Sequence, residues 1–476
     1  MNLLDTFHAR VAEHPDRVAI IDPRDRAISY AALAERAGVL AAAWEQSGLR
    51  PGDRVLLALG FSADLYAALA ALWRIGAVAV LPEPALGLKG IDVAVDSAAP
   101  RAVLLGGLYR LLPCFVSSLR GIALRLSMRP ARGAPPPVAD LQADAPALIS
   151  FTTGSTGRPK GIVRSHGFMA AQERAVAPLI GTGGHHEIDL VGFPVFVVAN
   201  LGQGITSVLP DWSLRRTDKV KGEEIALRIQ RHHVTRLLLN PALVERLVEV
   251  KIAAPVHSIF TGGGPVYPDL FARVRAARGD VRMVAVYGST EAEPIAEVEA
   301  ADIGADDFAA MRGGEGILAG RPVDAARVRI VDDEIQVTGE HVVKTYLDPA
   351  RDAETKQRDD DGTLWHRTGD AGRFDATGRL WLLGRMDGRI EGHFPFSVEA
   401  AARYWPGVRR AALAASRGRA VLAIEGDRAL AAEWRRCASA IGIADIVLIP
   451  RIPMDRRHGS KVDRARLAIL LEQRTG

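Results

Sequence analysis

The sequence predicts an α/β protein with a large N-terminal domain of layered sheets and helices, a β-rich subdomain, and a small α+β C-terminal domain. Three observations predict this class. Strand and helix patterns alternate through the first two thirds of the chain, short alternating strands follow residue 314, and a mixed pattern returns after residue 388. The length of 476 residues agrees with more than one domain.

The first elements are read from hydrophobic periodicity. Residues 29–48 carry apolar side chains at helical spacing and end at a glycine, and residues 53–60 form a short apolar run typical of a buried strand. The most apolar stretch, residues 65–81, is interrupted by Arg74 and is too short in its unbroken part to cross a bilayer. It predicts a helix followed by a buried strand.

The later parts of the chain show different residue patterns. Residues 128–143 are rich in proline and without periodicity, which predicts a surface connection. Residues 328–347 and 378–385 alternate in the manner of short strands with Asp-Asp and glycine turns, which predicts the β-rich subdomain.

Composition restricts the partners of the protein. Lys plus Arg number 60 against 56 for Asp plus Glu, a net charge of +4, and no long block of like charge occurs, so we expect no nucleic-acid partner. Two distant cysteines and an N-terminus without a signal-peptide layout predict a reduced, cytoplasmic location. His185-His186-Glu187 and His232-His233 lack zinc-ligand spacing, so we expect no metal there.

The strongest local signal is a loop that suits a polyphosphate. Residues 151–161 read FTTGSTGRPKG after a short apolar run that predicts a strand. Glycines let backbone N–H groups approach an anion, hydroxyls add donors, and the lysine adds positive charge. The spacing is neither that of a Walker A loop nor that of a Rossmann fingerprint. The candidate phosphate-binding residues are Thr152, Thr153, Gly154, Ser155, Thr156, Gly157 and Lys160.

This string resembles the phosphate loop shared by acyl-CoA synthetases, peptide-synthetase adenylation domains and luciferases, the adenylate-forming superfamily. The later motifs follow in the family's order along nearly the whole chain. The resemblance implies ATP and Mg²⁺ as cofactors, and a reaction in which a carboxylic acid becomes an acyl-adenylate with release of pyrophosphate. It also implies a domain over 1–386 that binds ATP and the acid, and a small mobile domain over 387–476 that carries a catalytic lysine. Thr156 and Lys160 would then act in catalysis.

Two further motifs carry the resemblance in the central part of the chain. Residues 260–265, FTGGGP, resemble the glycine turn that lies against adenine, which makes Gly262, Gly263 and Gly264 candidates. Residues 287–291, YGSTE, are similar to the family's Tyr-Gly-x-Thr-Glu. In that motif the tyrosine faces adenine, the threonine reaches the α-phosphate and the glutamate holds Mg²⁺. The candidates are Tyr287, Gly288, Thr290 and Glu291.

The remaining motifs lie near the C-terminus. Residues 368–370, TGD, resemble the ribose-binding turn, in which Asp370 would accept hydrogen bonds from the sugar. Residues 384–387, GRMD, match the start of the hinge motif, with Arg385 near ribose and phosphate and Asp387 at the swivel. The closing loop IPMDRRHGSKVDR offers Lys461 as the adenylation lysine, although its usual threonine-containing lead-in is replaced by Asp-Arg-Arg-His.

The ATP motifs do not decide the fate of the adenylate. At the segment Phe193-Pro194-Val195-Phe196-Val197, which we expect at the substrate pocket, Val197 replaces the histidine common in acyl-CoA ligases. This segment, the unusual closing loop and residues 204–211 resemble the β-lactone synthetases of bacterial olefin biosynthesis, which adenylate a β-hydroxy acid and close it to a lactone. The hinge sequence and the short C-terminal part depart from that pattern.

Three hypotheses stay open at this point. The first is an adenylating enzyme for a fatty or 3-hydroxy fatty acid that ends in lactone closure. The second is a ligase that transfers the acyl group to CoA or to an acyl-carrier protein. The third is a non-catalytic relative that binds nucleotide or an acyl chain; the intact loop, Glu291 and Lys461 argue against it.

Overall fold

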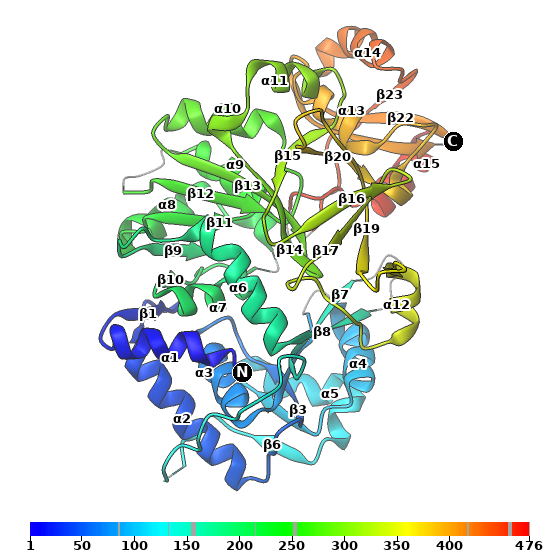
Figure 1. Cartoon of the computed structure of the whole chain (residues 1–476). Coiled ribbons are helices and arrows are strands. Elements are labelled where there is room, and N and C mark those ends of the chain that lie inside the picture. Colours follow the sequence, from blue (N-terminus) through cyan, green and yellow to red (C-terminus); the bar gives the residue numbers. More distant parts are fainter. Residues whose placement is uncertain are drawn as a thin grey trace. The chain divides into compact units, whose positions relative to one another are not determined.

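The computed structural model describes residues 1–83, 86–131, 133–153, 159–214, 216–250, 255–416, 418–455 and 459–475, with the backbone only of Thr153, Arg474 and Thr475 (Figure 1). The chain divides into two compact units. Unit 1 comprises Met1–Ser213, Glu291–Glu293 and Gly339–Arg358, and unit 2 comprises Leu214–Thr290, Pro294–Thr338 and Asp359–Gly476. The division does not test the domain boundary expected at residue 387, which stays a prediction.

Unit 1 contains a six-stranded sheet in the order β6-β5-β3-β4-β7-β8. Its pairs are parallel except for β7 and β8, which run antiparallel. The strands are β3 (Arg54–Ala58), β4 (Val78–Leu81), β5 (Ala102–Leu105), β6 (Leu124–Leu126), β7 (Pro146–Thr153) and β8 (Pro159–Ser165). Parallel strands need helical crossovers, which accounts for the α/β alternation read from the sequence.

Helices and a second group of strands complete unit 1. Strands β9, β10, β1 and β2 pair in that order. They are β1 (Val18–Ile21), β2 (Ala27–Ser29), β9 (Ile188–Val191) and β10 (Thr206–Val208). The helices are α1 (Leu4–Glu13), α2 (Tyr30–Gln46), α3 (Ala63–Ile75), α4 (Gly87–Ala98), α5 (Leu112–Phe115), α6 (His166–Ile180), α7 (Pro194–Gln203) and α12 (Pro349–Thr355).

Unit 2 combines a parallel part with an antiparallel part. The order of its long sheet is β16-β17-β19-β20-β15-β14-β13-β12-β11, in which β11, β12 and β13 are parallel. The strands are β11 (Arg236–Leu239), β12 (Ser258–Gly262), β13 (Arg282–Ser289), β14 (Ala292–Glu299), β15 (Ile317–Pro322), β16 (Arg327–Val331), β17 (Glu334–Thr338), β19 (Leu364–Phe374) and β20 (Leu380–Arg385). The antiparallel strands from β15 onward are the predicted β-rich part.

The C-terminal part of unit 2 has a sheet of its own, in the order β21-β22-β23. Its strands are β21 (Val408–Ser416), β22 (Arg419–Gly426) and β23 (Asp445–Leu448). The helices of unit 2 are α8 (Gly222–His232), α9 (Pro241–Val248), α10 (Pro268–Ala277), α11 (Ala305–Arg312), α13 (Pro395–Ala402), α14 (Ala431–Ala440) and α15 (Arg464–Thr475). Helix α13 packs on both β20 and β21, and therefore links the two sheets of this unit (Figure 1).

Each unit buries its own apolar core. Trp44 on α2 and Trp434 on α14 are almost wholly buried, and their indole N–H groups donate to the carbonyls of Ser127 and Pro406. A buried tryptophan needs such an acceptor because its N–H would otherwise lose its bond to water.

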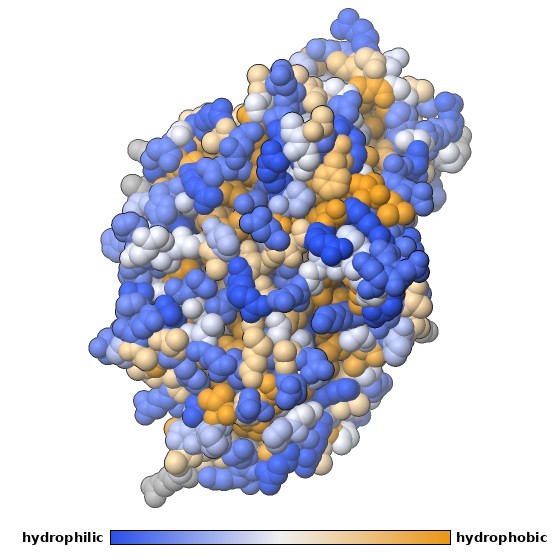
Figure 2. Space-filling model, in the orientation of Figure 1, coloured by the Kyte–Doolittle hydropathy of each residue, from blue (hydrophilic) through white to orange (hydrophobic). Residues whose placement is uncertain are grey.

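The face of the molecule in Figure 2 is mostly hydrophilic, with apolar residues between the polar ones.

The predicted elements are confirmed. Residues 29–48 contain α2, whose N-terminus is capped by the Ser29 hydroxyl, and residues 65–81 contain the end of α3 followed by β4. The Asp-Asp turn joins β16 to β17, and Asp332 and Asp333 take φ values of 49° and 66°, the left-handed pair that a two-residue hairpin requires. Residues 128–131 and 133–143 contain no helix or strand.

In the part of the chain that the structure describes, no helix is both long enough and apolar enough to cross a bilayer.

Candidate active site

The predicted phosphate loop begins and ends on two paired strands of unit 1. Thr152 on β7 pairs with Lys160 on β8. The two strands therefore bring the ends of the loop together at one end of the sheet, which is where parallel α/β sheets usually bind ligands. Gly154, Ser155, Thr156 and Gly157 lie outside the described residues, as does the side chain of Thr153.

A second segment of unit 1 lies along β8 immediately after Lys160. The Leu347 N–H donates to the Gly161 carbonyl at 2.7 Å, and Ile162 forms an antiparallel bridge with Tyr346. A Cβ added at Gly161 would lie 2.8 Å from the Leu347 Cβ, closer than real Cβ atoms approach. The glycine after Lys160 is thus required by packing against this segment.

The same segment holds Glu291. The Tyr346 hydroxyl donates to Glu291 Oε1 at 3.0 Å, and the Val343 N–H donates to the Glu291 carbonyl at 2.8 Å. Lys356 donates to the carbonyl of Val343. Burial lowers the pKa of Lys356 to about 8, although the negative charges of Glu291 and Asp352 act in the opposite direction. The structure therefore brings the predicted metal-binding glutamate and the strand of Lys160 to one segment, residues 342–347.

A second cluster, in unit 2, contains the residues predicted to hold the nucleoside. Asp370 accepts from the Tyr287 hydroxyl at 2.9 Å through Oδ2 and from Arg385 Nη1 at 3.0 Å through Oδ1. Arg385 also donates to the Thr368 carbonyl. Burial raises the pKa of Asp370, and the positive charges of Arg385 and Lys461 oppose that rise. Tyr287, Asp370 and Arg385 thus form one hydrogen-bonded group.

The glycine turn follows β12 in the same unit. Gly262 faces the Val286 carbonyl of β13, from which an added Cβ would be only 2.4 Å away, and Gly263 has φ +72°. A Cβ at Gly264 would lie 2.3 Å from the Ser460 hydroxyl oxygen. Packing accounts for Gly262 and Gly264, the left-handed backbone accounts for Gly263, and contact with adenine stays a prediction.

The closing loop packs against the glycine turn at Gly264. Ser460 lies against the glycine turn and Lys461 is the next residue, with its Cγ 3.8 Å from the position of a Gly264 Cβ. The loop closes on itself: the Asp455 N–H donates to the Lys461 carbonyl at 2.8 Å, and the Lys461 N–H donates to Asp455 Oδ1 at 3.1 Å. The predicted catalytic lysine is therefore held beside the glycine turn.

A buried ionic network fixes the part of unit 2 that carries this loop. Glu399 on α13 is 1% exposed. It accepts from the Tyr267 hydroxyl at 2.8 Å, from Arg464 Nη2 at 2.7 Å and from the Leu413 N–H at 3.0 Å. Since Arg464 begins the helix that follows the loop, the network ties α13, β21 and α15 to the start of α10.

A second arginine, Arg403, links the end of α13 to helices α9 and α10. Arg403 donates to Asp269 Oδ1 and Oδ2 at 2.9 and 2.8 Å, and to Glu245 Oε1 at 2.8 Å. Both acidic residues come from helices that precede the β-rich part, α9 and α10. These contacts between buried or half-buried charges hold the C-terminal segment where Lys461 reaches the glycine turn.

The predicted hinge and substrate residues lie in different surroundings. Asp387 is largely exposed, and its Oδ1 is 3.9 Å from Arg385 Nε. Phe193 is the N-cap residue of α7. Its ring contacts the ring of Phe196 edge to face, with 5.9 Å between the ring centroids. Val197 is fully buried in the core of unit 1. The hinge role of Asp387 and the substrate role of Phe193, Phe196 and Val197 stay predictions.

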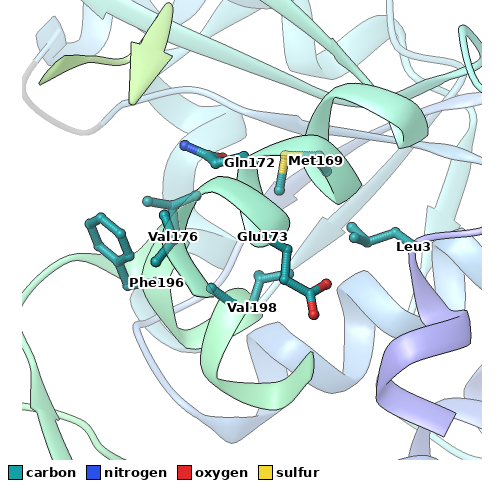
Figure 3. Close-up of a pocket in the computed structure, with 9 residues that line it drawn as sticks. Leu3, Met169, Gln172, Glu173, Val176, Phe196 and Val198 are labelled. Atoms are coloured by element: carbon teal, nitrogen blue, oxygen red, sulfur yellow. The ribbon is translucent and has the colours of Figure 1, made fainter. Parts of the chain in front are cut away.

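Phe196 lines a small pocket between α6 and α7 (Figure 3). Met169, Val176 and Val198 give the pocket apolar walls, and Glu173 is its acidic residue. Glu173 accepts from the Thr6 hydroxyl at 3.0 Å and from Gln203 Nε2 at 3.2 Å. Burial nevertheless raises the pKa of its carboxyl. Val195 and Phe196 of the predicted segment line this pocket, and the sequence did not reveal the lining residues of α6 because they belong to no motif.

The described residues fit a magnesium nucleotide. Among them no group of three or more His, Cys, Asp or Glu could hold a metal by itself. Mg²⁺ commonly takes one or two carboxylates and completes its shell with phosphates and water, and Glu291 offers one such carboxylate. Each oxygen of Asp370 accepts one of the two bonds above, and an ionised carboxylate has about four acceptor positions, so it can also accept from sugar hydroxyls.

Comparison with known proteins decides the family. Residues 7–347 match the family described as AMP-binding enzyme. The chain belongs to this family. It is 31% identical to an olefin β-lactone synthetase of Xanthomonas campestris, over 99% of this chain and 98% of the relative. It is 30% identical to an olefin β-lactone synthetase of Stenotrophomonas maltophilia, over 96% and 95%.

Solved structures of other enzymes have the same fold. ATP-bound MatB from Rhodopseudomonas palustris matches with a TM-score of 0.82 and 20% identity, over all of both chains. The O-succinylbenzoate CoA synthetase of Bacillus subtilis, in complex with ATP and magnesium, matches with a TM-score of 0.78 and 21% identity, over 97% of this chain and 99% of that one. With the relatives above, the family makes this chain an adenylate-forming enzyme that activates an acid.

The buried carboxylate at the centre of the network is open to a direct test. We expect Glu399→Gln to lower the free energy of opening of α13 and β21 by about 2–4 kcal/mol, because Arg464 and the Tyr267 hydroxyl lose an ionic partner in a buried place. Hydrogen exchange of the amides in these two elements measures the change. Glu472→Gln, on the exposed side of α15, is the matched control. Equal exchange rates in both variants would show that Glu399 does not hold this part of the chain.

Proposed function

We propose that this enzyme uses ATP and Mg²⁺ to adenylate a 3-hydroxy fatty acid, and that the hydroxyl of the acyl-adenylate then closes to a β-lactone. The observation that supports the first step is the packing of Ser460 on Gly264, which places Lys461 against the glycine turn at the end of β12. A lysine in that place supports charge stabilisation at a phosphate.

The first step needs three kinds of side chain. A carboxylate oxygen of the acid attacks the α-phosphorus of ATP, and the bond to the β-phosphate oxygen breaks with release of pyrophosphate. Lys160 and Lys461 supply positive charge for the phosphates, and Asp370 would accept hydrogen bonds from the ribose. Glu291 would hold Mg²⁺, which neutralises phosphate charge when bound. Hydroxyls of the phosphate loop, among them Thr156, would add donors.

The second step distinguishes this proposal from thioester formation. The 3-hydroxyl oxygen attacks the acyl carbon, the bond to the phosphate oxygen of AMP breaks, and the hydroxyl proton passes to water. Both groups belong to one molecule, so a site that holds them together makes the step unimolecular. Support comes from the two β-lactone synthetases similar over nearly the full length and from Val197, where many CoA ligases have a histidine.

Lys461 separates the two steps experimentally. We expect Lys461→Ala to reduce ATP–pyrophosphate exchange roughly 10²–10³-fold, the size of one preorganised charge-stabilising donor. The same variant should consume a synthetic acyl-adenylate at close to the normal rate. Lys89→Ala removes an exposed lysine of α4 and serves as the control. A similar loss in both steps would contradict the assignment of Lys461 to adenylation alone.

The product is the decisive test of the finer proposal. We expect a 3-hydroxy fatty acid with ATP and Mg²⁺ to give AMP and a β-lactone without CoA, identified by mass spectrometry and NMR. The matching fatty acid without the hydroxyl is the control, and should give adenylate but no lactone. Turnover that begins only when CoA or an acyl-carrier protein is added, with a thioester as product, would assign the enzyme to the ligases instead.

A further inference from the structure

We infer that Tyr346 is a positioning residue for the metal site: its hydroxyl orients the carboxylate of Glu291 for Mg²⁺. The inference rests on the proposed function in one respect, the assignment of Mg²⁺ to Glu291. Tyr346 belongs to none of the motifs that the sequence offered, and it is recognised only from its contact with Glu291 Oε1 at 3.0 Å.

Tyr346 is itself held rigidly. Its side chain is 3% exposed. Its backbone N–H donates to Asp352 Oδ1 at 2.9 Å, while the hydroxyl of Thr345 donates to the other carboxylate oxygen of Asp352 at 2.6 Å. Asp352 lies in α12, so a helix anchors the backbone from which the phenol extends. A donor fixed in this way can restrict the rotation of the carboxylate that it contacts.

The backbone of Glu291 is fixed by the same segment. Val343 donates to the Glu291 carbonyl, and Ala292 forms a bridge with Val342. Lys356 donates to the carbonyl of Val343. The side chain and the main chain of the glutamate are therefore both held by residues 342–347.

The segment also connects Glu291 to the phosphate strand. Tyr346 forms its bridge with Ile162, two residues after Lys160. A single residue thus contacts the strand that carries the phosphate-binding lysine and the carboxylate assigned to the metal. Partners that orient metal ligands commonly contribute 10–100-fold to metal affinity, which sets the size of the expected effect.

The test is Tyr346→Phe, which removes the hydroxyl and keeps the ring. Binding of Mn²⁺ in the presence of a non-hydrolysable ATP analogue, followed by electron paramagnetic resonance, reports on the metal independently of turnover. We expect Mn²⁺ to bind about 10-fold more weakly. The Mg²⁺ concentration for half-maximal ATP–pyrophosphate exchange should rise by a similar factor, and saturating Mg²⁺ should restore most of the rate.

Tyr30→Phe is the matched control, because Tyr30 is also buried in unit 1 and its hydroxyl donates to two backbone carbonyls, those of Asn200 and Ile205, and not to a carboxylate. It should leave Mn²⁺ affinity unchanged. Wild-type affinity in the Tyr346→Phe variant would overturn the positioning role. If instead the wild-type enzyme bound no Mn²⁺ with the analogue, or if Glu291→Gln left the affinity unchanged, the assignment of the metal to Glu291 would fail.

Discussion

The arrangement of unit 2 depends on one buried charge, the carboxylate of Glu399. A carboxylate that is 1% exposed is stable only when it is paired, and three donors from three different elements meet it. Satisfying this charge fixes α13 against β21 and α15, and draws Tyr267 at the start of α10 into the same network. The closing loop immediately precedes Arg464, so the position of Lys461 follows from this constraint.

In unit 1, a comparable set of contacts lies next to the predicted phosphate loop. Residues 342–347 form backbone contacts with both the strand after the phosphate loop and the residues around Glu291. In each unit, then, a motif that the sequence shows contains the predicted functional groups, and a segment outside the motifs fixes their position. The chemistry requires both, because a charge-stabilising group acts only when it is preorganised.

Periodicity and motif spacing were sufficient for the fold class, for elements such as α2, α3 and β4, and for the turn at Asp332-Asp333, because each depends on local sequence. The candidate site residues came from the family resemblance and not from periodicity. The partners of those residues could not be predicted: Tyr346 is 55 positions from Glu291, and Arg464 is 65 positions from Glu399. The packing of Ser460 against Gly264 could not be predicted either, because only the tertiary structure brings these two residues together.

Transfer of an oxygen isotope tests the central claim, acid activation by adenylation, most directly. A substrate acid labelled with ¹⁸O in its carboxylate is incubated with ATP, Mg²⁺ and the enzyme, and the nucleotide product is analysed by mass spectrometry. Attack of the carboxylate on the α-phosphorus places one labelled oxygen in AMP, whatever accepts the acyl group afterwards. The account predicts singly labelled AMP and unlabelled pyrophosphate. Unlabelled AMP, or ADP with labelled phosphate, would contradict it.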